Sequence, residues 1–126
     1  MKHNIVRYIG QVGVIMKIGI VGSRSLVISS LDEYVPEECT EIISGGAAGV
    51  DKCAADYAKS KNILLTEILP EYKIYGKGAP LIRNKIIVEK ADIIIAFWDE
   101  KSKGTKFVID YANRLGKPCK IITKKG

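Results

Sequence analysis

Five short apolar runs, separated by segments with helical periodicity, are the feature that most constrains the fold of this chain. The runs lie at residues 17–21, 41–44, 63–69, 91–97 and 119–123. The fourth run is apolar at nearly every position, which is typical of a strand that is covered on both faces. Strands that alternate with helices form a parallel sheet with right-handed crossovers. We therefore predict an α/β protein with a three-layer, doubly wound fold and a five-stranded parallel sheet in the order 3-2-1-4-5.

The segments between these runs supply the helices of the crossovers. We predict helices over residues 28–35, over 47–60, from Pro80 and from Thr105. Pro36 ends the first and Gly116 ends the last, whereas residues 70–79 form an irregular loop. In such folds, ligands bind beyond the carboxyl ends of the strands, at the point where the strand order reverses. The loops after the first, second and fourth strands are therefore the candidates for a site.

Length and composition limit the other possibilities. With 126 residues and 47% hydrophobic content, the chain fits one domain. No apolar run approaches the roughly 18 residues of a membrane span, and the first residues lack a signal-peptide pattern. Three scattered cysteines and the single histidine, His3, indicate neither a disulfide framework nor a metal site. We expect no metal, no cofactor, no membrane partner and a cytoplasmic location.

The charge of the chain favours an anionic partner. The formal net charge is +6, and residues 101–126 hold eight Lys or Arg and only one acidic residue, Asp110. Residues 32–41 are acidic, with no basic residue among them. Both stretches are typical of solvated surfaces, so the charge alone does not distinguish a nucleotide from a polymer.

A glycine-rich turn, Ser-Gly-Gly-Ala-Ala-Gly-Val-Asp at residues 44–51, follows the second apolar run. Glycines leave no Cβ between main-chain N–H groups and an anion, and a helix start adds its own unpaired N–H groups. We predict that Gly45, Gly46 and Ala47 offer N–H groups to a phosphate. Gly49 would permit close approach, and Ser44 would add a hydroxyl. A tight turn that serves packing alone is the alternative.

Asp51, at the end of this turn, has two equal interpretations. A carboxylate beside a phosphate is repelled unless it meets a ribose hydroxyl or an arginine. The alternative is a residue of the first helical turn that complements the helix dipole.

Three further segments would lie at the same end of the predicted sheet. Gly22, Ser23 and Arg24 follow the first strand, and the planar guanidinium of Arg24 suits a phosphate better than a surface ion pair. Arg83 and Asn84, in the opening turn of the third helix, would bind phosphate and ribose or base, although Asn84 also fits a local cap.

The loop after the fourth strand adds the last candidates. Trp98 would stack on a base or pack under the loop. Ser102, Gly104 and Thr105 are typical of a second anion site at a helix terminus.

These motifs together resemble a known family. Residues 17–123 are similar to the SLOG superfamily of Rossmann-like proteins, specifically its small YspA-like branch. The resemblance rests on Gly22-Ser23-Arg24, the turn at 44–51, Arg83-Asn84, Ala96-Phe97-Trp98-Asp99 and Ser102-Lys103-Gly104-Thr105. Residues 16–126 would then be a SLOG-like Rossmann domain, and residues 1–15 an N-terminal extension or edge strand.

The resemblance implies a pocket for a small nucleotide-derived ligand, such as an ADP-ribose-like compound, in a sensor that forms a homo-oligomer, most simply a dimer. Other members of the superfamily suggest two alternatives. LOG-type phosphoribohydrolases cleave a base from a nucleotide. The glutamate that these enzymes carry three residues after their Gly-Thr pair is Val108 here. Asp51 or Asp99 would therefore have to take the role of that glutamate. DprA binds single-stranded DNA, which makes nucleic acid a possible but less favoured partner.

Overall fold

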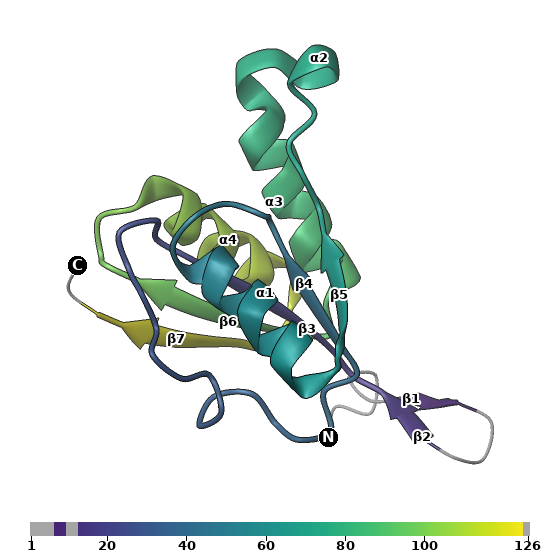
Figure 1. The fold of residues 1–126 in the computed structure, drawn as a ribbon. Coiled ribbons are helices and arrows are strands. Elements are labelled where there is room, and N and C mark those ends of the chain that lie inside the picture. Colours follow the sequence, from purple (N-terminus) through teal and green to yellow (C-terminus); the bar gives the residue numbers. More distant parts are fainter. Residues whose placement is uncertain (1–6, 10–12, 125–126) are drawn as a thin grey trace.

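The computed structural model describes residues 7–9 and 13–124. In chain order, the elements are β1 (Arg7–Ile9), β2 (Gly13–Ile15), β3 (Lys17–Gly22), β4 (Glu41–Ser44), α1 (Val50–Lys61), β5 (Leu64–Glu67), α2 (Tyr72–Tyr75), the 3-10 helix η2 (Gly76–Gly78), α3 (Ala79–Lys90), β6 (Ile93–Trp98), α4 (Lys103–Leu115) and β7 (Cys119–Thr123). β1 and β2 pair antiparallel with each other, in a small sheet separate from the main one (Figure 1).

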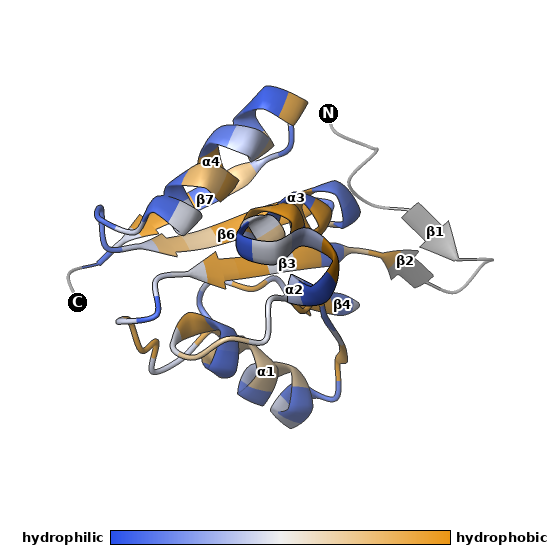
Figure 2. Cartoon of the chain, turned by 90° about the horizontal axis from the view of Figure 1, so that it is seen from above, coloured by the Kyte–Doolittle hydropathy of each residue, from blue (hydrophilic) through white to orange (hydrophobic). Residues whose placement is uncertain are grey.

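The main sheet has five parallel strands in the order β5-β4-β3-β6-β7. This confirms the predicted α/β fold and the predicted strand order. α1 covers one face, and α3 and α4 cover the other, so that the apolar strands lie between two helical layers (Figure 2). None of the helices among residues 7–9 and 13–124 is both long and apolar enough to cross a membrane.

The two faces of the sheet are buried by alternate side chains of the same strands. Ile18 and Ile20 of β3 belong to the core beneath α1, whereas Val21 belongs to the core beneath α3 and α4. In β6, Ile95 and Phe97 likewise lie in the first core. A strand buried on both faces needs apolar residues at nearly every position, which explains the continuous apolar runs.

The predicted helix over residues 28–35 is wrong: the connection from β3 to β4 contains isolated turns, one of them at residues 31–35, and no helix. The carbonyl of Leu31 accepts hydrogen bonds from the N–H groups of Tyr34 and Val35, both at 3.0 Å, and Pro36 follows. Immediately before this turn, Ser30 Oγ accepts the N–H of Asp32 at 3.3 Å. This contact is a local turn, and no series of helical hydrogen bonds follows it.

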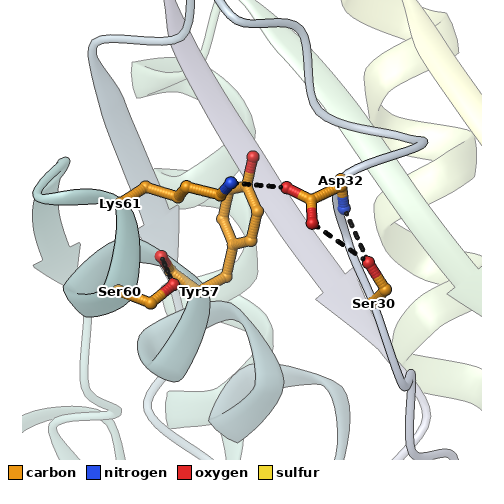
Figure 3. A network of polar contacts seen from close by, with 5 residues as sticks. All are labelled: Ser30, Asp32, Tyr57, Ser60 and Lys61. Atoms are coloured by element: carbon orange, nitrogen blue, oxygen red, sulfur yellow. Dashed lines mark hydrogen bonds and ion pairs between the residues drawn. The ribbon is translucent and has the colours of Figure 1, made fainter.

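The apolar side chains of this connection are buried even without a helix. Leu31 and Val35 are buried, and the Tyr34 ring packs edge-on against Phe97, with ring centroids 5.1 Å apart. An ion pair of 2.9 Å between Asp32 and Lys61 joins the connection to the end of α1 (Figure 3). The position of the chain therefore follows the apolar pattern, although its local conformation does not.

Smaller differences concern the ends of the helices. Residues 72–78 form α2 and η2 instead of an irregular loop, because the Glu71 carbonyl accepts the N–H groups of Ile74 and Tyr75. α1 begins at Val50, three residues later than predicted, since Gly49 has φ 71°. α4 begins at Lys103, before the predicted Thr105, because Ser102 is its N-cap.

Candidate functional site

A pocket of about 400 Å³ lies at the carboxyl ends of β3, β4 and β6, where the strand order reverses between β3 and β6. Its volume falls within the range of roughly 300–1,000 Å³ that is usual for ligand sites. It is lined by Val21, Gly22, Ser23, Arg24, Ser25, Gly45, Ala47, Asp51, Pro80, Arg83, Asn84, Ile87, Asp99, Ser102, Gly104, Thr105 and Val108. All the predicted binding residues belong to this lining except Ser44, Gly46, Gly49 and Trp98.

The four residues outside the lining support the loops around the pocket. Ser44 is fully buried, and its Oγ lies 3.5 Å from the N–H of Gly46, to which it forms a weak hydrogen bond. Gly46 has φ 71°, and a Cβ there would lie 2.5 Å from Leu69. Trp98 donates its Nε1–H to the Ser102 carbonyl at 3.0 Å and packs against the core, so that its ring lies outside the pocket lining.

Gly49 joins two of the loops that form the pocket. A Cβ at this position would overlap the backbone carbonyl of Arg24, and its φ of 71° with ψ −124° lies in a region that is open essentially only to glycine. The start of α1 therefore lies directly against the backbone of the loop after β3. This contact sets the position of Arg24 relative to the glycine turn.

Arg83 reaches from α3 to the glycine turn. Its Nη1 donates to the Gly45 carbonyl at 2.6 Å and, more weakly, to the Ile68 carbonyl at 3.4 Å, while its Nε donates to Asn84 Oδ1 at 2.9 Å. Gly45 needs to be glycine because a Cβ would lie 2.5 Å from Arg83 Nη1 and 2.9 Å from Asp51 Oδ2. The guanidinium is thus fixed at the wall of the pocket.

The two arginines of the pocket repel each other. Desolvation is the main cause of the lowered pKa of Arg83. The charge of Asp51 raises this pKa, and the charge of Arg24 lowers it. In the described part of the chain, the ion pairs join Lys52 to Asp56, Lys61 to Asp32 and Lys106 to Asp110. Neither guanidinium therefore has a carboxylate of a described residue at ion-pair distance, and both contribute positive potential to one pocket.

Asp51 uses one of the N–H groups that the sequence assigned to a ligand. Its Oδ2 accepts the N–H of Ala47 at 3.1 Å, and the residue is only 8% exposed. Burial raises the pKa of Asp51, and the Ala47 N–H and the charge of Arg83 oppose this rise. The Asp51 carboxylate thus binds the backbone of the glycine turn itself, and fewer N–H groups of the turn are available to a ligand than predicted.

The start of α4 is capped in a similar way. Asp99 Oδ1 accepts the N–H groups of Ser102 at 2.8 Å and Lys101 at 2.9 Å, and these bonds lower the pKa of Asp99 to about 2. Ser102 Oγ accepts the N–H of Thr105 at 3.4 Å. Gly104, by contrast, has open space where a side chain would be, with Asn84 Nδ2 at 3.8 Å as the nearest atom. Of the predicted second anion site, Gly104 therefore has the space next to it that a ligand would need.

Six lining residues were not among the predicted binding residues: Val21, Ser25, Pro80, Ile87, Asp99 and Val108. Ser25 and Asp99 stand in the same strand-end loops as predicted residues, so their position in the sequence was the available signal. Val21, Ile87 and Val108 are buried core residues that reach the pocket, and an apolar pattern does not distinguish such residues from the rest of the core. Among residues 7–9 and 13–124, no group of three or more His, Cys, Asp or Glu side chains is placed to hold a metal ion.

Comparisons of the chain with protein-family models, curated proteins and solved structures found no match. The functional argument therefore depends on the geometry of the pocket.

Proposed function

We propose that this pocket binds a phosphate-bearing nucleotide or nucleotide derivative, of which ADP-ribose is an example, and that the chain acts as a sensor of that ligand. The observation that carries the proposal is the pair of arginines, Arg24 and Arg83, which line one pocket without a carboxylate at ion-pair distance among the described residues. An anion between them would relieve their repulsion. Arginine is the side chain best suited to planar, bidentate contacts with phosphate.

The other wall residues fit the rest of such a ligand. Asn84 and the open surface at Gly104 adjoin each other, so that main chain and amide would be available to a sugar or a second phosphate. Val21, Ile87 and Val108 supply an apolar part of the lining. Apolar surface with a few polar groups is the usual composition of a small-molecule site. The resemblance of the motifs to the SLOG superfamily supports the same proposal.

A thermal-shift panel of ADP-ribose, AMP, NAD and a single-stranded oligonucleotide tests this function, because a ligand that binds only the native state raises its stability. We expect stabilisation by ADP-ribose that is lost in Arg24→Ala. Arg114→Ala, which removes an exposed guanidinium of α4 outside the pocket lining, is the matched control and should keep the response. Stabilisation by the oligonucleotide alone, with a steep loss in salt, would instead favour the DNA-binding alternative.

A second candidate function, hydrolysis or transfer at a nucleotide N-glycosidic bond, is favoured by one observation. Asp51 and Asp99 both line the pocket, and their pKa values move in opposite directions. Such divergence is typical of acid and base pairs. Val108, which stands where LOG-type enzymes carry a glutamate, also lines the pocket but has no carboxylate. Sustained release of free base from AMP, abolished in Asp51→Asn, would establish turnover.

We also infer a homodimer and a cytoplasmic location. The dimer is what the family resemblance implies. It is supported by exposed apolar residues in the segment around α2, which projects from the sheet in Figure 1: Leu69, Tyr72, Ile74, Tyr75 and Leu81. The location is supported by free thiols at Cys39, Cys53 and Cys119, which suit a reducing compartment. Light scattering that gives the mass of a single chain would contradict the dimer.

A further inference from the structure

Asp99 presents a partly exposed carboxylate to a pocket that otherwise suits an anion. It lies in the loop after β6, between the end of that strand and the start of α4. The N–H groups of Lys101 and Ser102 hold it ionised. An ionised carboxylate only accepts hydrogen bonds, so a phosphate beside it would be repelled. The group of the ligand that faces Asp99 must therefore be a hydrogen-bond donor.

The two oxygens of Asp99 have different partners. Oδ1 accepts both backbone N–H groups, at 2.8 and 2.9 Å, and these two bonds are sufficient to close the turn at residues 99–102. Oδ2 accepts the hydroxyl of Ser25 at 3.3 Å, and the hydroxyl of Ser23 also stabilises the carboxylate. The bond from Ser25 is long for an O–H donor, whose usual distance is about 2.7–2.8 Å. Oδ2 therefore retains the capacity to accept another donor.

Ser25 places a second polar group beside this oxygen. It is exposed, lines the pocket and stands next to Arg24 in the loop after β3. Its hydroxyl both donates and accepts. A ligand hydroxyl that donates its hydrogen to Asp99 Oδ2 could therefore accept the hydroxyl hydrogen of Ser25 on its own oxygen, one residue away from the predicted phosphate contact.

Asp51, the other carboxylate of the pocket, is less suited to this role. Its Oδ2 is used by Ala47, its side chain is buried beside Arg83, and burial disfavours its charged form. Asp99, by contrast, is held in its charged form, and its backbone partners, the N–H groups of Ser102 and Lys101, both use Oδ1. Ribose is the part of a nucleotide that presents hydroxyl donors close to a phosphate, and a carboxylate on a ribose hydroxyl is a known way to read that sugar.

We propose that Asp99, assisted by Ser25, accepts a hydrogen bond from a ribose hydroxyl and makes the pocket select ribonucleotides over their deoxy counterparts. The inference rests on the proposed function, because it concerns the sugar of the ligand whose phosphate the two arginines bind. It adds Asp99 as a residue that determines specificity, in addition to its role in the turn.

Calorimetric titration of the full chain with AMP, 2′-deoxy-AMP and 3′-deoxy-AMP tests the inference. We expect one deoxy ligand to bind about tenfold more weakly than AMP, as the loss of one charge-assisted hydrogen bond at a partly exposed site implies. In Asp99→Asn, the amide oxygen still accepts the two turn N–H groups, whereas an amide donor replaces Oδ2. Because this amide can meet the ribose hydroxyl only through a weaker, neutral hydrogen bond, the preference of the variant for AMP should fall well below tenfold. Asp110→Asn, an exposed change on α4 outside the pocket lining, should keep the tenfold preference.

The outcomes separate this inference from the function on which it rests. If AMP and both deoxy ligands bind wild type equally, and Arg24→Ala weakens all three, the phosphate site stands and the sugar contact is refuted. If Asp99→Asn keeps the preference for AMP, another residue reads the sugar, and the inference is again refuted. If none of the three binds wild type, both proposals fail. A purely structural role of Asp99 would weaken all ligands alike and leave their ratio unchanged.

Discussion

Replacement of Arg83 by methionine tests whether this side chain holds the wall of the pocket together. Arg83→Met keeps an unbranched apolar stem in the place of the arginine stem but removes the hydrogen bonds to the carbonyls of Gly45 and Ile68 and to Asn84. Only the bond to Gly45, at 2.6 Å, has the length of a strong charge-assisted bond, and such bonds contribute about 1.5–3 kcal/mol. Relief of the repulsion from Arg24 and of guanidinium desolvation offsets part of this loss. We expect the free energy of unfolding at pH 7 to fall by about 1–2 kcal/mol.

The pH dependence of this loss identifies its cause. Arg83 opposes the rise that burial causes in the pKa of Asp51, so its removal should raise that pKa further. A group whose pKa is higher in the folded than in the unfolded state contributes stability that is fully present below the unfolded pKa, here about 3.8, and that is lost as pH rises through the folded pKa. Arg83→Met should therefore be more destabilised at pH 7 than near pH 3.5.

Urea unfolding at these two pH values, followed by circular dichroism, measures the difference. Arg114→Met is the matched control, because that arginine is exposed and lies outside the pocket lining. In an Asp51→Asn background, the loss caused by Arg83→Met should become independent of pH. A loss that is equal at both pH values when Asp51 is present, or that keeps its pH dependence in the Asp51→Asn background, would refute the coupling between the two residues.

Two further predictions concern the loops around the pocket. Gly49→Ala should lower the free energy of unfolding in urea by about 3 kcal/mol, because a Cβ there would meet the Arg24 carbonyl in a backbone region restricted to glycine. Gly116→Ala, at φ 73° with open space around it, should lower it by only about 1 kcal/mol. Equal losses in the two variants would contradict the contact between Gly49 and Arg24. The low pKa of Asp99 contributes stability that is present above about pH 4 and lost as pH falls toward 2, so Asp99→Asn should flatten the stability profile in that window. An unchanged profile would contradict this account of Asp99.

The strand order could be predicted from the sequence because doubly wound parallel sheets commonly have this order. Each strand is a short apolar run, and alternation with helices dictates parallel pairing. The helix over residues 28–35 was predicted wrongly, because isolated turns bury the same apolar side chains that a helix would have buried. Burial of Leu31 and Val35 shows that the pattern predicted the core more reliably than the local conformation.

The grouping of the pocket residues followed from the topology, but the use of their polar groups did not. Arg83 bonds to Gly45, 38 positions earlier in the chain, and no local pattern indicates this contact. The glycine turn and the start of α4 were predicted as anion sites, yet Asp51 accepts the N–H of Ala47 and Asp99 accepts that of Ser102. As a result, the positive potential of the pocket depends more on the guanidinium groups, and less on helix starts, than the sequence indicated.

A ³¹P NMR pH titration of bound AMP measures whether an anionic phosphate lies between Arg24 and Arg83. The second pKa of a phosphate monoester is about 6 in water, and neighbouring positive charges stabilise the dianion. If the phosphate lies between the two arginines, its pKa should be lower in the complex than in free AMP. Arg24→Met should move this pKa back toward the value in free AMP, whereas Arg114→Met should leave it unchanged. A bound phosphate that titrates as in free AMP, or that is insensitive to Arg24→Met, would contradict the account.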